Sequence, residues 1–322
     1  MKRCEEMELQ FLGTGAGMPS KARNVSSVAL KINDHASVWL FDCGEGTQHQ
    51  MLHTPIKPGK ITKIMITHLH GDHLFGLPGL LGSRSFLGTG APLHIYGPIG
   101  LKQYIDTVFT LSETHVTYPL IVHEIQEEGL LFTDEGFSVE VRQLDHVIPC
   151  YGYRIQEHDR PGRLKVEKLR ALNIPAGPLF RQLKEGQDVW LEDGTCLKSQ
   201  DFVEAATRGR IVTILGDTRP CAAAIALAQD ADVLLHEATS LHERVEHVNA
   251  YGHSSAQQAG SVAAEAKARF LILQHVSARY SEQDEALLIA EAKTQTNHVA
   301  VARDFACYRL DASGTVREAA GT

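Results

Sequence analysis

The sequence predicts a mixed α/β protein in which short apolar strands alternate with helices. Apolar runs of strand length repeatedly end in polar residues, and segments of helical periodicity separate several of these runs. Hydrophobic residues make up 43% and charged residues 22% of the 322 residues, as in an ordinary globular protein. This length exceeds one average domain, so we expect one large unit or a core with an appendage.

Strands open the chain. Residues 7–17 form an apolar strand that runs into a glycine-rich turn, and residues 25–32 and 37–41 form a hairpin around Asn33-Asp34. The next expected elements are a helix at 47–52, a strand at 61–67, a strand at 93–96, a helix at 100–111 and a pair of strands at 121–125 and 137–144. Later come strands at 211–215, 233–235 and 270–273 and a helix at 255–267, capped by Ser254 or Ser255.

Residues 151–205 interrupt this alternation. Proline and glycine steps such as Pro161-Gly162 and Gly177-Pro178 break the segment into short charged pieces with little apolar periodicity. Residues 154–184 contain eight basic and three acidic residues, against a net charge of −8 for the whole chain. We therefore interpret 151–205 as a basic insertion into a core formed by residues 1–150 and 206–322.

Composition and the N-terminal sequence exclude several classes of protein. The net charge of −8 argues against a protein that coats nucleic acid generally. No apolar run reaches about 18 residues, and the first residues lack the apolar stretch of a signal peptide. The six cysteines are scattered and form no C-x-x-C pair. We expect a cytoplasmic protein without a membrane segment.

The densest chemical signal is the segment His68-Leu69-His70-Gly71-Asp72-His73. The pattern H-x-H-x-D-H would arise by chance in roughly 3 of 1,000 such chains. Imidazole and carboxylate groups are suitable zinc ligands. In extended backbone His68 and His70 point the same way, whereas Asp72 and His73 lie around the turn and can bind a second ion.

Three further donors follow apolar runs: His146, Asp217 and His275. Each by itself is equally well explained as an ordinary polar residue at a strand end. Their recurrence matters because sites in open α/β sheets lie at the carboxyl ends of strands. We expect two zinc ions, the first held by His68, His70 and His146, the second by Asp72, His73 and His275, with Asp217 shared between them.

Glu237 and His253 fall at the same expected edge of the sheet. A histidine oriented by a carboxylate can protonate a leaving alkoxide. Position alone leaves an ordinary structural role for both residues equally open.

Several longer motifs accompany the metal pattern. They are Phe11-Leu12-Gly13-Thr14-Gly15, Pro19-Ser20-Lys21-Ala22-Arg23-Asn24, Phe41-Asp42-Cys43-Gly44-Glu45, Gly79-Leu80-Leu81-Gly82-Ser83-Arg84, His236-Glu237-Ala238-Thr239 and His275-Val276-Ser277-Ala278-Arg279-Tyr280. From Met7 onward the chain resembles the RNase Z family, the tRNA 3′-processing endoribonucleases, in its short bacterial form. This family belongs to the metallo-β-lactamase superfamily. The resemblance implies an α+β fold, the four-layer αβ/βα sandwich of that superfamily, with an inserted flexible arm.

The resemblance also implies roles for individual residues. Asp72 would be the catalytic proton acceptor as well as a metal ligand, and His253 with Glu237 would assist the leaving group. The loop with Lys21, Arg23 and Asn24 would contact the 3′ terminus of the substrate.

Residues 151–205 would be the family's flexible arm, a tRNA exosite in which Gly177-Pro178 matches the Gly-Pro motif of that arm. The protein would act as a homodimer in which the arm of one subunit clasps the tRNA processed by the other.

The expected activity is zinc-dependent endoribonuclease cleavage that removes the 3′ trailer from precursor tRNA. Hydroxide rather than the 2′-hydroxyl of the RNA would attack, leaving a 3′-hydroxyl on the tRNA and a 5′-phosphate on the trailer. One alternative is a small-substrate metallo-phosphodiesterase or arylsulfatase of the same superfamily, which the basic insertion disfavours. Another is a non-catalytic tRNA-binding zinc scaffold, which the complete set of seven ligands disfavours.

Overall fold

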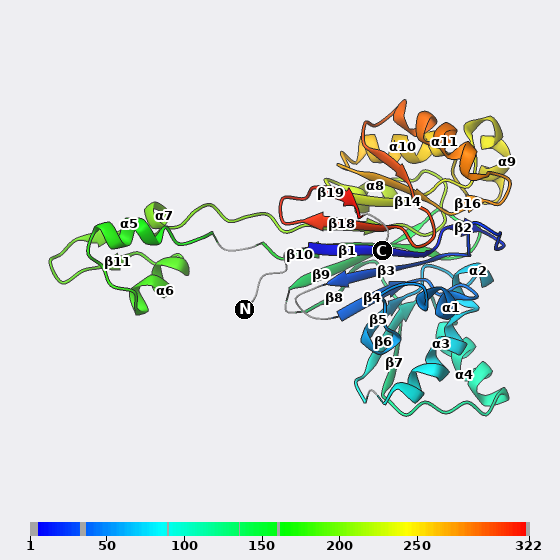
Figure 1. The fold of residues 1–322 in the computed structure, drawn as a ribbon, viewed down its shortest axis with the longest axis horizontal. Helices are drawn as coiled ribbons and strands as arrows, with labels where there is room; N and C mark the ends of the chain where they lie inside the picture. Colours follow the sequence, from blue (N-terminus) through cyan, green and yellow to red (C-terminus); the bar gives the residue numbers. More distant parts are fainter. Residues whose placement is uncertain (1–5, 33–36, 89, 135, 160–161, 320–322) are drawn as a thin grey trace. The chain divides into compact units, whose positions relative to one another are not determined.

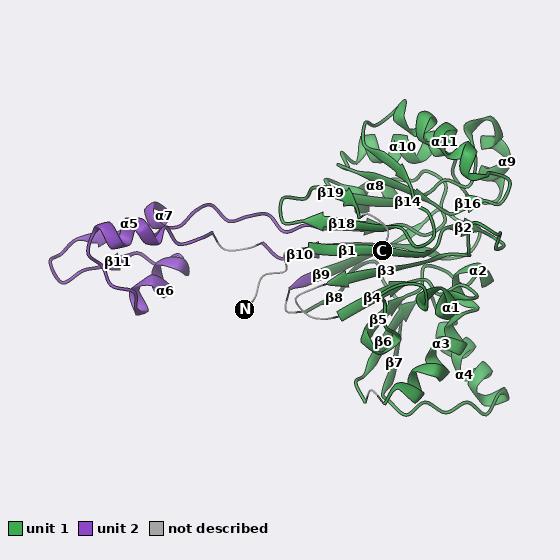
Figure 2. Ribbon diagram, in the orientation of Figure 1, with its two compact units in different colours: residues 1–134, 138–155, 211–322 green, residues 135–137, 156–210 purple. Residues whose placement is uncertain are grey.

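The computed structural model describes residues 6–32, 37–88, 90–134, 136–159 and 162–319. They fall into two compact units (Figure 2). Unit 1 contains the residues up to 134 together with 138–155 and 211–322, and unit 2 contains 135–137 and 156–210. Within the described part of the chain, no helix combines the length and the apolar character that crossing a membrane requires.

Unit 1 is built on two large sheets. The eight-stranded sheet has the order β19 (Val316–Glu318), β18 (Cys307–Asp311), β1 (Glu6–Gly13), β3 (Ser27–Ile32), β4 (Ser37–Phe41), β5 (Ile61–Met65), β6 (Leu93–Gly97), β7 (Leu120–Glu124). The seven-stranded sheet has the order β17 (Val299–Val301), β15 (Leu271–Gln274), β14 (Val233–Glu237), β13 (Ile211–Ile214), β10 (Cys150–Glu157), β9 (Phe137–Leu144), β8 (Gly129–Thr133). β2 (Gly15–Ala16) pairs with β16 (Val276–Ser277).

Helices cover the outer face of each sheet (Figure 1). The eight-stranded sheet packs against α1 (Thr47–Met51), α2 (Gly71–Leu74), α3 (Leu77–Arg84) and α4 (Leu101–Leu111). The seven-stranded sheet packs against α8 (Ala222–Ala228), α10 (Ala256–Glu265) and α11 (Glu285–Lys293), with α9 (Val245–Ala250) nearby. Between the sheets, Phe41 contacts Tyr153 at 5.9 Å and Trp39 contacts Phe132 at 5.6 Å between ring centroids. The predicted four-layer sandwich is confirmed.

Local sequence explains why α10 begins where it does. The Ser255 hydroxyl accepts a hydrogen bond from the backbone N–H of Gln258, and the Gln258 side chain accepts one from the Ser255 N–H. This capping box satisfies donors that the first helical turn leaves unpaired. Ala259, Val262 and Ala263 are buried against the sheet, as the periodicity predicts.

The predicted hairpin is confirmed, since β3 and β4 pair antiparallel with Ile32 opposite Ser37. Its turn at Asn33-Asp34 lies outside the described residues. The predicted pairing of residues 121–125 with 137–144 is wrong, because β7 pairs with β6 and β9 pairs with β8, in different sheets. The sequence analysis did not predict β8. This strand directly precedes β9 in the chain and pairs with it, in place of the expected partner at residues 121–125.

Strand β10 extends the core sheet to Glu157, past the expected start of the insertion at residue 151. Tyr151, Tyr153 and Ile155 are buried, so the first residues of the expected insertion belong to the core instead. Unit 2 then forms α5 (Val166–Ala171), α6 (Pro178–Lys184), α7 (Ser199–Phe202) and the hairpin of β11 (Val189–Trp190) with β12 (Cys196–Leu197). These elements enclose a small core that includes Leu169, Leu183 and Leu197.

Candidate metal centre

The seven predicted metal ligands meet at one edge of the two sheets in unit 1. His68 follows β5, Asp217 follows β13 and His275 follows β15. β13, β14 and β15 are parallel, so their carboxyl ends reach the same edge. The remaining four predicted ligands are His70, Asp72 and His73 at or beside α2, and His146 just after β9.

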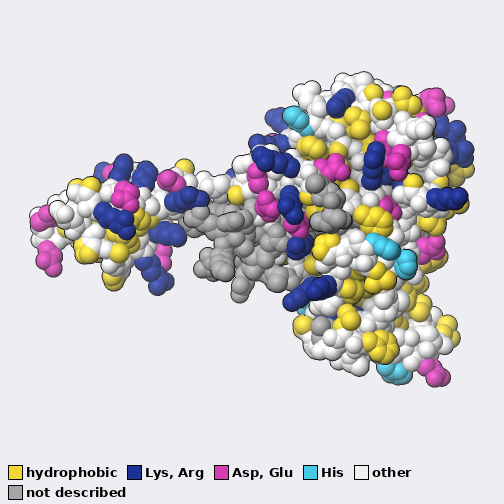
Figure 3. Space-filling view, viewed as in Figure 1, with side chains coloured by type: hydrophobic (Ala, Val, Ile, Leu, Met, Phe, Trp, Pro, Cys, Tyr) yellow, Lys and Arg dark blue, Asp and Glu magenta, His cyan; other side chains and the backbone are white. Residues whose placement is uncertain are grey.

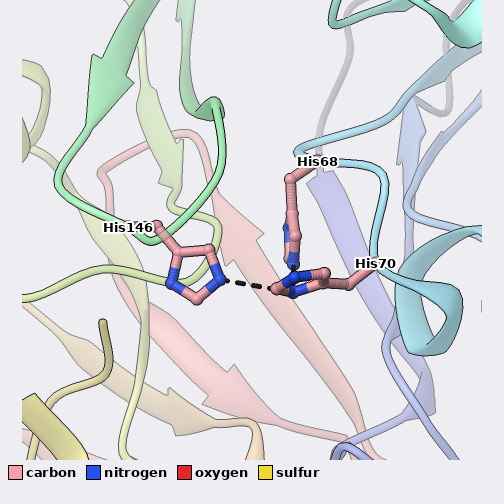
Figure 4. Close-up of side chains that lie close together, drawn as sticks. All are labelled: His68, His70 and His146. Atoms are coloured by element: carbon pink, nitrogen blue, oxygen red, sulfur yellow. Dashed lines mark hydrogen bonds between the residues drawn. The ribbon is translucent and has the colours of Figure 1, made fainter. Parts of the chain in front are cut away.

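Three imidazoles form the first group of donors. The His68 Nε2 and His70 Nδ1 atoms lie 3.1 Å apart, and His146 Nε2 lies 3.3 Å from the same His70 nitrogen. Figure 4 shows the His146 ring reaching toward His68 and His70 from the opposite side. These nitrogens face a common point.

The second group consists of Asp72, His73 and His275. The Asp72 Oδ2 atom lies 3.5 Å from His73 Nε2 and 3.4 Å from His275 Nε2. Asp217 lies between the two groups, with its Oδ2 atom 3.6 Å from His68 Nε2, 3.5 Å from His73 Nε2 and 3.3 Å from His275 Nε2. One carboxylate oxygen therefore faces both groups.

These spacings and the burial of the donors fit a metal centre. Ligand atoms about 2.0–2.1 Å from a tetrahedral zinc ion lie about 3.3 Å apart, close to the separations within both groups. The His73 Nε2 atom is buried and makes no hydrogen bond to any described residue. A buried nitrogen without a hydrogen bond is costly, and a metal ion between it and the two carboxylate oxygens 3.5 Å away would supply the missing interaction.

Other residues orient the predicted ligands through hydrogen bonds, and the sequence analysis assigned no role to any of them. The Asp42 Oδ2 atom accepts a hydrogen bond from His73 Nδ1 at 2.7 Å, and Asp42 also accepts from the Thr67 hydroxyl and backbone N–H. The Thr239 hydroxyl lies 3.0 Å from His275 Nδ1, and the Gly252 carbonyl lies 2.9 Å from His146 Nδ1. Asp42 could have been found, because it directly follows β4 beside β5, where the strand-end rule predicts site residues.

Burial and neighbouring charges shift the pKa values of the side chains in this cluster. Burial, reinforced by the neighbouring His73, lowers the pKa of His68 well below its ordinary value. Burial and His146 lower the pKa of His70. Burial would raise the pKa of Asp217, but His275 and His73 hold it well below the usual range. Burial would lower the pKa of His73 as well, but Asp217 and Asp42 raise it well above its ordinary value. A metal ion would displace the extra proton of His73, because metal binding requires neutral imidazoles beside an ionised carboxylate.

Glu237 and His253 adjoin the second group of donors. The Glu237 Oε1 atom accepts a hydrogen bond from His253 Nδ1 at 3.0 Å, while Thr239 donates to Glu237 Oε2 at 2.7 Å. Burial alone would lower the pKa of His253, but the Glu237 carboxylate raises it to about 9. Glu237 thus holds the His253 ring beside the predicted metal ligands and favours the protonated form of the ring.

The predicted substrate-contacting residues have different environments. Arg23 is buried, and its guanidinium pairs with Glu285 at 2.6 Å and donates to the Ala302 carbonyl. Lys21 and Asn24 line a cavity. Gly177 and Pro178 belong to unit 2, where Pro178 begins α6, a position that proline favours.

Comparison with known proteins finds relatives that match almost the whole chain and a family model that matches its first half. A Ribonuclease Z from Bacillus cereus (strain AH187) is 52% identical over 306 residues, which are 95% of this chain and 100% of that protein. A family model described as Anti-Pycsar protein Apyc1 matches residues 7–158.

Solved structures show the same likeness. The crystal structure of human tRNase Z, short form, is 32% identical with a TM-score of 0.67, covering 93% of this chain and 98% of that one. The metallo-beta-lactamase fold protein YhfI from Bacillus subtilis is 20% identical with a TM-score of 0.66, covering 95% of this chain and 99% of that one. At that identity the second likeness concerns the fold alone.

Proposed function

The chain belongs to the ribonuclease Z family, and from this membership we propose that it removes the 3′ trailer from precursor tRNA as a metal-dependent endoribonuclease. The convergence of five histidines and two aspartates on two adjoining donor groups carries this proposal. Two zinc ions are the expected cofactor, the first held by His68, His70 and His146, the second by Asp72, His73 and His275, with Asp217 shared. When bound, such ions acidify water and neutralise charge on a phosphate.

The residues of the chain supply the proton transfers. Asp72 accepts the proton of the attacking water, and its Oδ2 atom is positioned by a hydrogen bond from the Gly17 backbone N–H at 2.8 Å. Water attacks phosphorus, and the bond to the 3′-oxygen of the tRNA breaks. His253, held by Glu237, donates a proton to that oxygen. The products are a 3′-hydroxyl on the tRNA and a 5′-phosphate on the trailer.

The part of the predicted insertion that belongs to unit 2, residues 156–205, acts as the tRNA-binding arm. Its positive charge is concentrated in the first half, since residues 156–184 contain seven basic and three acidic residues, whereas residues 185–204 contain six acidic residues and one lysine. Figure 3 shows Lys and Arg side chains over much of unit 2, with acidic side chains at its left tip and a few among the basic ones. We assign the phosphate contacts to the basic half, with Gly177 and Pro178 shaping the start of α6.

A homodimer accounts for a group of exposed apolar side chains on unit 1. Phe86 is 91% exposed, and other large apolar residues at or beside α1 to α4 are also exposed: Leu52, Phe75, Leu87, Ile99 and Leu111. Monomeric proteins seldom expose many large apolar side chains in one region. A second copy of the chain is the proposed partner of this surface.

A cytoplasmic location agrees with the cysteines, because the five in the described part of the chain form no disulfide with one another. The activity is tested by incubating the zinc-loaded protein with a trailer-bearing precursor tRNA and mapping both ends of the products. Cleavage that leaves a 3′-phosphate or a cyclic phosphate on the tRNA would contradict the proposed mechanism. A chromogenic phosphodiester in parallel reports whether a small substrate is preferred.

A further inference from the structure

Two residues of the proposed reaction lie on loops. His146 lies just after β9, and His253 lies just after the short helix α9. A loop depends on tertiary contacts for a fixed position, because its backbone lacks the hydrogen-bond ladder of a helix or a sheet. The two imidazole rings are 5.1 Å apart between centroids, so both loops are held at one place. Several of the contacts that hold them are made by Arg219.

Arg219 lies at the carboxyl end of β13 and contacts both loops through its guanidinium. Nε and Nη2 donate to the two carboxylate oxygens of Asp145, at 2.9 and 2.6 Å. Nη1 donates to the Asn249 carbonyl at 2.9 Å. The Arg219 backbone N–H also donates to the Asp145 carbonyl at 2.9 Å. One residue therefore links the neighbour of His146 to the last turn of α9.

This arrangement requires an arginine. The planar guanidinium presents its N–H groups as a rigid fork, so that two of them match a carboxylate while a third reaches another acceptor. A lysine has the same charge on a single nitrogen and lacks the fork. The Arg219 and Asp145 side chains are 33% and 47% exposed, and an ion pair this accessible adds little to stability. Its main effect is therefore on the position of the two loops.

The loop that follows Asn249 carries the proposed proton donor. The Asn249 carbonyl accepts from the Gly252 N–H at 3.1 Å as well as from Arg219. The Gly252 carbonyl in turn accepts from His146 Nδ1 at 2.9 Å. A Cβ atom on Gly252 would lie 2.6 Å from that nitrogen, so the two loops are in close contact. His253 is the next residue, and its place relative to His146 depends on these contacts.

We propose that Arg219 is a positioning residue that holds the loop of His253 against the metal centre, so that the His253 ring can protonate the 3′-oxygen leaving phosphorus. The inference rests on the proposed function, in which His253 is the proton donor. Arg219 contacts no reacting atom and acts through the Asn249 carbonyl and the Asp145 carboxylate. Without the guanidinium, the loop loses one of the contacts that hold the ring in place.

Two substrates with different leaving groups report the position of the donor. The 3′-oxygen of RNA leaves as a strongly basic alkoxide that needs a proton, whereas p-nitrophenolate is a stable anion that leaves without one. With zinc at saturation, we expect Arg219→Gln to lower the single-turnover rate on precursor tRNA by about 10- to 100-fold. Affinity for the tRNA should not change, and the rate on bis(p-nitrophenyl) phosphate should hardly change.

Arg219→Lys separates position from charge. The lysine keeps the charge but cannot span Asp145 and Asn249, so it should be nearly as slow as Arg219→Gln. If Arg219 instead bound a phosphate of the RNA, the lysine variant should keep most of the rate, and Arg219→Gln should weaken tRNA binding and its salt dependence. Asp145→Asn has opposite outcomes under the two models, because it should slow cleavage if the pair positions the loop and tighten tRNA binding if Asp145 only restrains a phosphate-binding arginine.

Amide hydrogen exchange on the zinc-loaded protein is independent of activity. The Gly252 N–H shares its acceptor with Arg219, so it should exchange faster in Arg219→Gln than in the wild type. Arg309→Gln is the matched control, because Arg309 pairs with Glu8 where β18 meets β1. It should change neither the exchange of Gly252 nor the rate on either substrate.

Three results would overturn the proposal: an equal loss on both substrates, an Arg219→Lys protein as fast as the wild type, or an Arg219→Gln protein that cleaves precursor tRNA at the wild-type rate. A wild-type protein that leaves precursor tRNA uncut refutes the proposed function instead. In that case the exchange of Gly252 still shows whether Arg219 holds the loop.

Discussion

Asp42→Asn tests whether a residue outside the ligand set controls the metal centre. The Asp42 carboxylate accepts hydrogen bonds from His73 Nδ1, from the Thr67 hydroxyl and from the Thr67 backbone N–H, at 2.7, 2.9 and 2.7 Å. An asparagine keeps one oxygen for the backbone N–H of Thr67 and turns an NH₂ group toward His73. Thr67 can rotate and accept from this group, but two N–H donors cannot face each other. His73 must then move its proton to Nε2, the atom that faces Asp72 and Asp217.

The size of the effect follows from this change of tautomer. A protonated Nε2 cannot bind a metal ion, so metal binding by the variant must restore the other tautomer against an unfavourable contact. Loss of such an orienting carboxylate typically weakens metal binding 10- to 100-fold, or about 1.4–2.7 kcal/mol. We expect the weaker binding at the ion associated with Asp72, His73 and His275, and little change at the other.

The assay is competition for zinc against a chromogenic chelator, with metal stoichiometry determined on the same samples. Asp232→Asn is the matched control, because Asp232 is also a buried carboxylate that accepts a backbone N–H but lies at the opposite ends of the parallel strands. It should lower stability and leave zinc affinity unchanged. A folded Asp42→Asn protein that binds two zinc ions as tightly as the wild type would refute the reasoning.

Three other changes test separate parts of the proposed function. Removal of metal by a chelator should abolish cleavage and lower the thermal midpoint, because a metal ion at a free concentration about 1,000 times its dissociation constant stabilises the folded state by about 4 kcal/mol. Added zinc should restore both cleavage and midpoint. An unchanged midpoint would argue against a metal held by residues of the folded core. Replacing Lys168, Arg170 and Lys184 by glutamine should make tRNA binding less sensitive to salt. The negative slope of log affinity against log salt should become shallower by about 0.9 or less for each phosphate that is no longer neutralised, and turnover of a small diester should not change. Neutralising Glu192 and Asp193 is the control, and an equal change there would exclude the basic half as the phosphate-binding surface. Phe86→Glu should shift the protein from dimer to monomer in light scattering, whereas a wild type that is already monomeric would exclude the proposed homodimer.

Much of the fold could be predicted from local patterns. Apolar runs and capping residues predicted β1, β3, β4, β5, β6, α4, α10 and the parallel strands β13 to β15, because these elements bury one side of a regular backbone. Pairing was less predictable. β7 and β9 are both short runs that contain apolar residues, and nothing in either run says that the two strands belong to different sheets.

The candidate site was also predictable only in part. Local sequence was enough to identify which donors are available and that they follow strands, since H-x-H-x-D-H is a short motif and a strand end is recognisable without its partner. The folded chain was needed to show which donors face one another and that Asp42 orients His73. It was also needed to show that Arg23 forms a buried ion pair with Glu285, 262 residues away in the chain. This division arises because a side chain's chemistry is fixed by its type, whereas its burial and hydrogen-bond partners are fixed by segments that only folding brings together.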